Sequence, residues 1–399
     1  NTISNVVVDS CEIFNNITGY SENLTFNGNV DGAVISNCKI HHNKNIGICI
    51  AGNYKACSVP ILDHARNIHV YGNTVYQNIS QAATSAGIYV DGGRKVLIER
   101  NQSYHNGVGI EIGCECNGLT DSCAVRNNLV FDNLDWGIGV GGYDPETTGQ
   151  VLYTKVTNNT LYMNTVNNSG MGEFYIPKAS HCSFTNNIIY TSGQNVFYTF
   201  DAINPQSNNI FDYNCWYTPA NDPAKAKVNW RGQTLGSFST FQIATGFDKH
   251  SFYKNPIFVN PGTVSPNFQL QNNSPCIDSG DLSIDSFVGE TDFGGFQRID
   301  NNKVDVGAFE YNQTLSIQEP PLKGKLIIYP NPCNKNIFIQ GETDGAFIKI
   351  SDIGGHTVSQ GFYLSSGYDI SGVPNGIYLI SVKLTNAKTL TGKLVVQNN

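Results

Sequence analysis

The sequence has few charged side chains and no long apolar run. Only 14% of its 399 residues are Asp, Glu, Lys or Arg, and its formal net charge is -8. No dense Lys/Arg run supplies the basic patch that a nucleic-acid partner needs. No stretch approaches the ~18 apolar residues of a membrane helix. Because 40% of the residues are hydrophobic, the chain is too apolar for a disordered protein. We therefore expect a folded protein with no nucleic-acid partner and no membrane span.

Methionine (2) and tryptophan (3) are scarce, whereas glycine (40), tyrosine (20) and phenylalanine (21) are abundant. Asparagine recurs as Asn-Asn pairs. Aromatic and β-branched residues favour strands, and Gly and Asn favour tight turns. The composition predicts an all-β protein with few helices. A strand-like run already at Asn5–Val8, with no signal peptide before it, predicts a processed or trimmed chain.

The eleven cysteines do not form paired C-x-x-C units. Cys114, Cys116 and Cys123 have a poor spacing for a zinc site. We expect disulfides between neighbouring loops, or buried thiols, and no metal. Cys11 and Cys38 fall just before the bend of successive repeats, so they are expected to stack as a thiol pair or a disulfide.

A repeat with a period in the high twenties decides the fold. Separations of 36, 28, 27, 31, 28 and 27 residues relate the asparagines at equivalent positions: Asn37, Asn73, Asn101, Asn128, Asn159, Asn187 and Asn214. One short strand precedes each Asn, a second follows it, and a third is a G-I-x-V/I run. Such a unit is typical of one turn of a parallel β-helix, with Val, Ile and Leu inside and asparagine amides stacked at a bend.

The predicted solenoid covers residues 1–219 and is followed by three other regions. Residues 220–313 are expected to form an irregular cap over its end, with a short helix near Leu235–Thr245. Residues 314–324 are a linker. Residues 325–399, with alternating strands and Asn-Gly and Gly-Gly turns, predict a small β-sandwich.

The third strand of each repeat is the expected functional surface. The longest insertions follow it, at Gly52–His64, Gly113–Ser122 and Gly141–Gln150, and would wall a groove over it. Alternation places these residues outward: Tyr89, Asp91, Glu111, Gly113, Gly139, Gly141, Glu173 and Tyr175. Gly139 and Gly141 are expected to leave bare backbone as the floor of a hollow.

Carboxylates beside this hollow predict a two-carboxylate site. Rungs ~4.8 Å apart would bring Asp91 and Glu111 to ~5–6 Å, the separation of a retaining glycosidase. Glu173, two rungs farther and ~10 Å away, is nearer the inverting distance. Two carboxylates in one groove can split their pKa values, leaving one protonated as the acid. Substrate contacts are predicted for the glycines, Glu173 and four aromatic residues: Tyr89, Trp136, Tyr143 and Tyr175. Trp136 is either a sugar platform or a turn-packing residue.

The stretch GIYVDGGRKVLIERNQSYHNGVGIEIGCE, residues 87–115, resembles the catalytic region of the β-xylosidases of glycoside hydrolase family 120. The resemblance covers roughly residues 60–190. It implies a secreted β-helix enzyme that acts with retention on a poly- or oligosaccharide. Asp91 would be the nucleophile, and Glu111 or Glu115 the acid/base.

The C-terminal module carries Tyr329-Pro-Asn-Pro332, Asp352-Ile-Gly-Gly355, Pro374-Asn-Gly-Ile-Tyr378 and Lys393-Leu-Val-Val-Gln397. With these motifs it resembles the C-terminal sorting domain of the Bacteroidetes type IX secretion system. The resemblance implies the secretion machinery as a partner, export across the outer membrane, and release or surface attachment. An ordinary adhesive sandwich is the alternative interpretation.

Two other functions remain open. A polysaccharide lyase or uronate epimerase would need a base and a cation or Ca²⁺; the candidate residues are Arg94, Lys95, Arg126, Lys178 and Tyr175. The dispersed aspartates form no calcium cluster, so no cofactor is predicted. A non-catalytic glycan-binding surface protein or adhesin would use the same aromatic groove.

Overall fold

The computed structural model describes residues 1–311, except 82, 145, 201–206, 263–264 and 284–287, and residues 326–397, except 327, 340–344, 353–354, 365 and 385–388. The chain divides into two compact units, Asn1–Tyr311 and Asn312–Asn399. The expected linker, 314–324, lies outside the described residues, and the finer boundaries stay predictions. Within the described part of the chain, no helix is long and apolar enough to cross a membrane.

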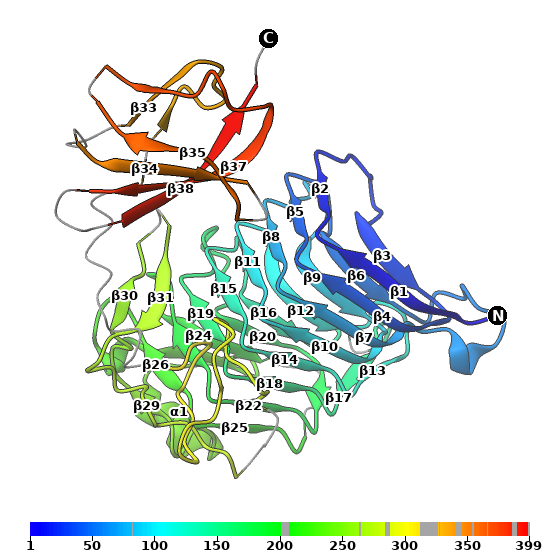
Figure 1. Cartoon of the computed structure of the whole chain (residues 1–399). Helices are drawn as coiled ribbons and strands as arrows, with labels where there is room; N and C mark the ends of the chain where they lie inside the picture. The colour runs from blue at the N-terminus through cyan, green and yellow to red at the C-terminus, as the bar shows by residue number, and fades with distance from the viewer. Residues whose placement is uncertain are drawn as a thin grey trace. The chain divides into compact units, whose positions relative to one another are not determined.

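Three sheets run along the first unit (Figure 1), and their strands are parallel except for the antiparallel pair β27 and β28, which confirms the predicted parallel β-helix. The first sheet contains β1 (Ile3–Asp9), β4 (Val30–Ser36), β7 (Arg66–Tyr71), β10 (Arg94–Glu99), β14 (Ala124–Arg126), β18 (Lys155–Thr157), β22 (Ser183–Thr185) and β25 (Ile210–Asp212), flanked by β13 (Leu119–Asp121), β17 (Gln150–Leu152) and β21 (Ala179–Ser180). The second sheet contains β2 (Glu12–Phe14), β5 (Lys39–His41), β8 (Thr74–Tyr76), β11 (Gln102–Tyr104), β15 (Leu129–Phe131), β19 (Thr160–Tyr162), β23 (Ile188–Tyr190), β26 (Cys215–Tyr217) and β29 (Phe252–Tyr253).

The third sheet carries the predicted site. It contains β3 (Leu24–Asn27), β6 (Ile48–Ala51), β9 (Ala86–Asp91), β12 (Val108–Gly113), β16 (Ile138–Val140), β20 (Phe174–Ile176), β24 (Val196–Phe200), β27 (Lys227–Trp230) and β28 (Gln233–Leu235). Ile88, Ile110 and Ile138 are paired on successive strands and fully buried, as the alternation predicts. The register from β6 to β20 therefore stacks equivalent positions of successive turns on one wall.

Side-chain amides join the turns at the bends. In the expected ladder, Asn101 Nδ2 donates to Asn128 Oδ1 over 3.0 Å, and Asn128 Nδ2 donates to Asn159 Oδ1 over 2.9 Å. The residue with left-handed backbone angles is the one before each ladder position, for example Asn127 with φ 54°. Asn37 occupies that preceding position (φ 53°), so the prediction that it belongs to the ladder is wrong. The ladder position beside it is Cys38, whose main-chain N–H donates to Asn73 Oδ1.

A second asparagine ladder, not predicted, follows the second sheet. Its members are Asn16, Asn43, Asn78, Asn106, Asn133 and Asn164. Each buried amide of this kind makes hydrogen bonds with main-chain and side-chain groups of the neighbouring turn, and these bonds fix the register between successive turns of the solenoid.

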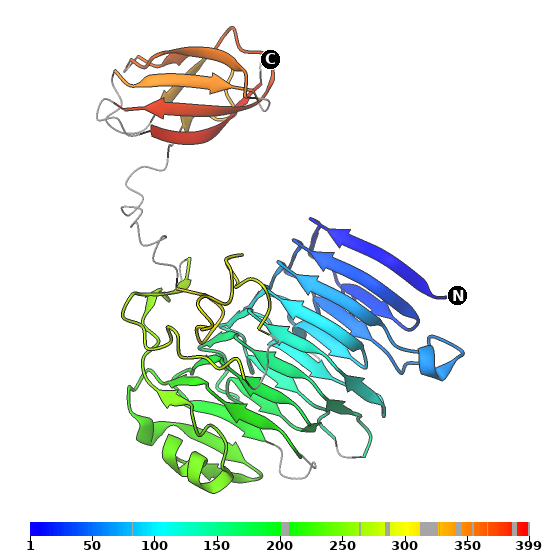
Figure 2. The ribbon, with the colours of Figure 1, turned by 60° about the horizontal axis from the view of Figure 1, so that its bottom comes forward.

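The expected cap region continues the solenoid before it becomes irregular. β27 adds to the third sheet and β29 to the second. The helix predicted near Leu235–Thr245 is α1 (Phe238–Thr245), which begins at the Ser237 cap and ends at Gly246 (Figure 2). Short 3-10 turns lie at η1 (Pro60–Leu62) and η2 (Pro223–Lys225), and β30 (Phe258–Asn260) pairs with β31 (Asn267–Leu270).

The second unit contains two antiparallel sheets around a core of its own, as expected for a small β-sandwich. One sheet contains β32 (Ile328–Tyr329), β33 (Asn336–Ile339) and β36 (Tyr368–Asp369). The other contains β34 (Phe347–Ser351), β35 (Thr357–Phe362), β37 (Gly376–Lys383) and β38 (Thr389–Val396).

Candidate functional site

Asp91 and Glu111 lie on neighbouring strands of the third sheet. Glu111 on β12 is paired with Tyr89 on β9, while Asp91 is paired with Gly113. Asp91 is therefore one strand and two residues away from Glu111, at the end of β9. The paired neighbours Ile88, Val90 and Ile112 point into the core, so alternation turns both acids to the outer face.

Two insertions converge on Asp91. Tyr54, in the insertion after β6, donates its hydroxyl to Oδ2 of Asp91. The main-chain N–H of Glu115, in the insertion after β12, donates to Oδ1 over 2.7 Å. These segments leave Asp91 only 3% exposed. Burial raises its pKa to about 6, although both hydrogen bonds act to lower it.

Glu111 has a different environment from Asp91. Burial, first, and then the nearby Glu115 and Asp91 carboxylates together raise the pKa of its carboxyl to about 8. No hydrogen bond from a described residue opposes these effects. The two neighbouring carboxyls thus have unequal environments, with the pKa of Glu111 raised further than that of Asp91.

Glu115 differs from Glu111 in position. Its side chain is exposed at the surface of the insertion, with Oε2 3.4 Å from the Tyr54 hydroxyl. Although the residue is exposed as a whole, partial burial of its carboxyl is the first of the causes that raise its pKa. The main chain of Glu115, rather than its carboxyl, is the group that contacts Asp91 directly.

The expected glycine-floored hollow is filled by the protein itself. A Cβ on Gly139 would lie 2.7 Å from Nε1 of Trp136, so the indole occupies that space. Gly141 has φ 133°, and the main-chain N of Lys178 fills the position of its Cβ. The prediction that these glycines leave bare backbone for a ligand is wrong, because other parts of the chain pack against both.

Glu173 does not point outward. It is fully buried and lies before β20, which begins at Phe174. Its Oε1 accepts the main-chain N–H of Asn164 over 3.0 Å, and its Oε2 accepts the Asn164 amide over 2.6 Å. Glu173 therefore ends the second asparagine ladder, and its predicted place in the groove is wrong.

The predicted aromatic contacts separate into buried and exposed residues. Tyr89 (4% exposed) and Trp136 (8% exposed) pack in an apolar cluster on the outer face of the sheet, which supports the turn-packing interpretation of Trp136. Tyr175, partly buried beside it, has its ring centre 5.0 Å from that of Trp136. Tyr143 is 64% exposed on the third insertion.

The cations considered for a lyase have other partners. Arg126 Nε pairs with Glu99 at 2.7 Å, and Arg94 Nε lies 3.6 Å from Asp121. Lys178 Nζ donates to the main-chain oxygen of Thr148. Lys95 is exposed on β10, in the first sheet. None of these contacts reaches Asp91 or Glu111.

The cysteines remain thiols. All eleven are free, and most are buried. The Cys11 main-chain N–H lies 3.5 Å from Cys38 Sγ, so these two stack as a thiol pair rather than a disulfide. Among the described residues, no group of three His, Cys, Asp or Glu side chains is arranged to hold a metal ion.

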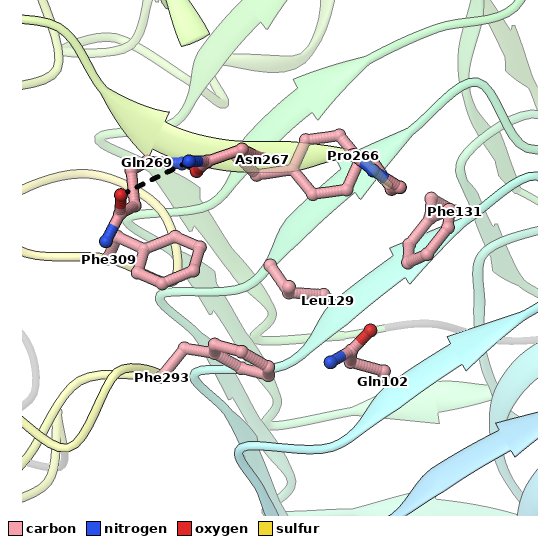
Figure 3. A pocket seen from close by; sticks show the side chains of 9 residues that line it. Gln102, Leu129, Phe131, Pro266, Asn267, Gln269, Phe293 and Phe309 are labelled. Atoms are coloured by element: carbon pink, nitrogen blue, oxygen red, sulfur yellow. Dashed lines mark hydrogen bonds between the residues drawn. The ribbon is translucent and has the colours of Figure 1, made fainter. Parts of the chain in front are cut away.

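A separate cavity of about 300 Å³ lies over the second sheet (Figure 3). Its lining combines aromatic rings, aliphatic groups and three side-chain amides: Gln102, Leu129, Phe131, Pro266, Asn267, Phe268, Gln269, Phe293 and Phe309. None of the predicted site residues lines it.

Tyr54 and the Glu115 N–H are the contributors that sequence reasoning missed. Both lie in insertions that were expected to wall the groove. Residues in loops do not alternate in direction as residues in strands do, so the sequence cannot predict where a single loop group points. The position of the insertions was the only feature that indicated a contribution from them.

Both parts of the chain are similar to known proteins. Residues 59–222 match the family model described as right handed beta helix region. An uncharacterized protein of Bacillus subtilis, YwoF, is 29% identical over 265 residues; the match covers 64% of this chain and 55% of YwoF. Among solved structures, that of pectate lyase Pel9A is similar, with a TM-score of 0.42 and 15% sequence identity, and the match covers 75% of this chain and 70% of the lyase chain. The structure described as XylC in complex with xylose gives a TM-score of 0.40 and 13% sequence identity, and the match covers 70% of this chain and 51% of the XylC chain.

The second unit has a match of its own. Residues 327–397 match the secretion system C-terminal sorting domain. The chain therefore joins a right-handed β-helix to a type IX secretion sorting domain, and it is a secreted or cell-surface protein.

Proposed function

We propose that this protein is an extracellular glycoside hydrolase that cleaves a poly- or oligosaccharide with Asp91 and Glu111 as its two carboxylates. The observation that carries the proposal is their place on neighbouring strands of one sheet face. Their unequal environments support it, because a retaining glycosidase needs one ionised and one protonated carboxyl at the same pH.

We assign the two roles from these environments. Asp91 accepts two hydrogen bonds and has the lower pKa, about 6, so it is the nucleophile. Glu111, with a pKa of about 8, keeps its proton at neutral pH and is the general acid. An Asp91 oxygen attacks the anomeric carbon while Glu111 transfers its proton to the glycosidic oxygen, which leaves with the aglycone. The Glu111 carboxylate then takes a proton from the water that displaces Asp91 from the sugar.

The substrate reaches Asp91 by displacing Tyr54. Tyr54 is 42% exposed, whereas Asp91 beneath it is 3% exposed. A sugar that enters from solvent therefore exchanges its own hydroxyl groups for the Tyr54 donor at Oδ2. Xylosides are the first substrates to test, because residues 87–115 resemble the β-xylosidases of family 120.

Elimination is less well supported than hydrolysis. Lyases and uronate epimerases need a cationic group near the uronate carboxylate. Here the charged groups that act on Glu111, which are Asp91 and Glu115, are both acidic. Arg94, Arg126 and Lys178 have partners elsewhere.

The test uses the full chain with aryl xylosides, other aryl glycosides and a panel of neutral and acidic polysaccharides. The proposal predicts new reducing ends from the wild type. Asp91→Asn and Glu111→Gln should lose turnover and still bind the glycan. Unsaturated products that absorb in the near ultraviolet would contradict hydrolysis and indicate elimination. Binding without turnover by the wild type would indicate a glycan-binding surface protein.

A further inference from the structure

A buried hydrogen-bond donor without a partner lies beside Glu111. Trp136 is 8% exposed, and its Nε1 has no hydrogen-bond partner among the residues that the structure describes. A buried donor left unpaired costs about 1–3 kcal/mol, so such a group calls for an explanation, and a catalytic role is one of the recognised ones.

The position of this donor depends on Gly139. On the third sheet, Gly139 stands between Glu111 on one strand and Tyr175 on the next. Because Gly139 has no side chain, the indole of Trp136 occupies the space above it, with Nε1 2.7 Å from the position of a Cβ. Any larger residue at 139 would displace the N–H edge of the ring.

Glu111 reaches the same point. Its Cγ lies 3.5 Å from that Cβ position, so the carboxyl and the indole N–H border one small space. The carboxyl receives no hydrogen bond from a described residue, and the charged groups that act on it, Asp91 and Glu115, are both acidic. A carboxyl without a donor and a donor without an acceptor are thus neighbours.

We infer that the Trp136 indole N–H is the donor that receives the Glu111 carboxylate after Glu111 has given up its proton. Trp136 is then a positioning residue that acts through Glu111. A role of this hydrogen bond in catalysis rests on the proposed function, because the bond would stabilise the ionised Glu111 carboxylate that activates water. The hydrogen bond itself can be measured without turnover.

The titratable groups around Glu111 limit what else could produce such an effect. They are Cys49 on β6, Tyr89 and Asp91 on β9, Glu115 after β12 and Tyr175 on β20. All of them are neutral or negative in their ordinary states, so ionisation of any of them cannot supply a positive partner to the Glu111 carboxylate.

The experiment follows the three indole N–H signals of the full chain by ¹H–¹⁵N NMR between pH 5 and pH 10. Trp136→Phe, which keeps an aromatic ring, identifies the Trp136 signal. We expect that signal to move downfield as the Glu111 carboxyl ionises, and to stop titrating in Glu111→Gln. A Trp136 signal that does not follow the ionisation of Glu111 would overturn the inference. A shift that appears only when oligosaccharide is added would also overturn it, because the acceptor would then be the substrate.

A second readout uses ¹³C-labelled glutamate. Loss of the donor should raise the pKa of Glu111 by about one unit in Trp136→Phe, since hydrogen bonds to charged groups have about this effect. Trp230→Phe, on β27 of the same sheet, is the matched control and should leave it unchanged. An unchanged pKa in Trp136→Phe would show that the indole only packs. Both readouts remain valid if no glycoside is cleaved, so failure of the proposed function and failure of this inference give different results.

Discussion

The main-chain N–H of Glu115 donates to Oδ1 of Asp91 over 2.7 Å. The insertion after β12 thereby returns to the end of β9 and holds the Asp91 carboxyl in one orientation. Together with the Tyr54 hydroxyl at Oδ2, this contact holds the Asp91 carboxylate beside the end of β12, the strand that carries Glu111.

Asp91→Asn should remove activity without unfolding the protein. The Asn oxygen can still accept the Glu115 N–H, so the local structure is retained, but the amide is not a nucleophile. We expect kcat to fall by at least about 10²-fold and the melting temperature to stay near that of the wild type. Glu146→Gln, at an exposed acid on the third insertion, is the control and should be fully active. An Asp91→Asn variant with wild-type turnover would remove Asp91 from the mechanism.

Glu111→Gln and Glu115→Gln should differ in activity. Glu111 is the acid on the sheet face, whereas Glu115 contacts Asp91 through its main chain, which the substitution keeps. We expect a loss of about 10²–10⁴-fold for Glu111→Gln and a change of no more than about threefold for Glu115→Gln. Steady-state kinetics on the same substrate measure both. The reverse order of effects would assign the acid to Glu115.

The pH profile of kcat/KM should be bell-shaped. Asp91 must lose its proton to attack, so activity rises as the pH increases through about 6. Glu111 must keep its proton, so activity falls as the pH increases through about 8. Tyr54→Phe removes a donor that favours ionised Asp91, so it should move the lower limb to higher pH and leave the upper limb in place. A lower limb unaffected by Tyr54→Phe would show that it does not report Asp91.

Glu173→Gln should destabilise the β-helix. Both Glu173 oxygens accept N–H groups of Asn164, and a glutamine would place its own NH₂ opposite one of these donors. We expect the free energy of unfolding in urea to fall by about 1–3 kcal/mol, with no comparable loss in Glu146→Gln. Equal stability of Glu173→Gln and the wild type would contradict its role as the end of the ladder.

The place of Asp91 and Glu111 on neighbouring strands, two residues apart in register, could be predicted from the sequence because it follows from the period and the alternation of residues within strands. Glu173 was misplaced because the alternation was extended one residue too far. β20 begins at Phe174, after Gly172 with φ 86°, so Glu173 belongs to the turn.

The details around the carboxyls could not be predicted in the same way. Tyr54 and the Glu115 N–H reach Asp91 from insertions, whose conformation depends on contacts between loops. A glycine leaves space, but the sequence does not say whether a ligand or the chain fills it. At Gly139 it is the Trp136 indole.

The stereochemistry of the first product tests the central claim most directly. ¹H NMR of the anomeric proton during the first minutes of cleavage distinguishes the two outcomes before mutarotation. With Asp91 as nucleophile and Glu111 as acid/base, the newly released sugar should have the same anomeric configuration as the substrate. A product of inverted configuration would contradict the account, because Asp91 would then not form a bond to the sugar.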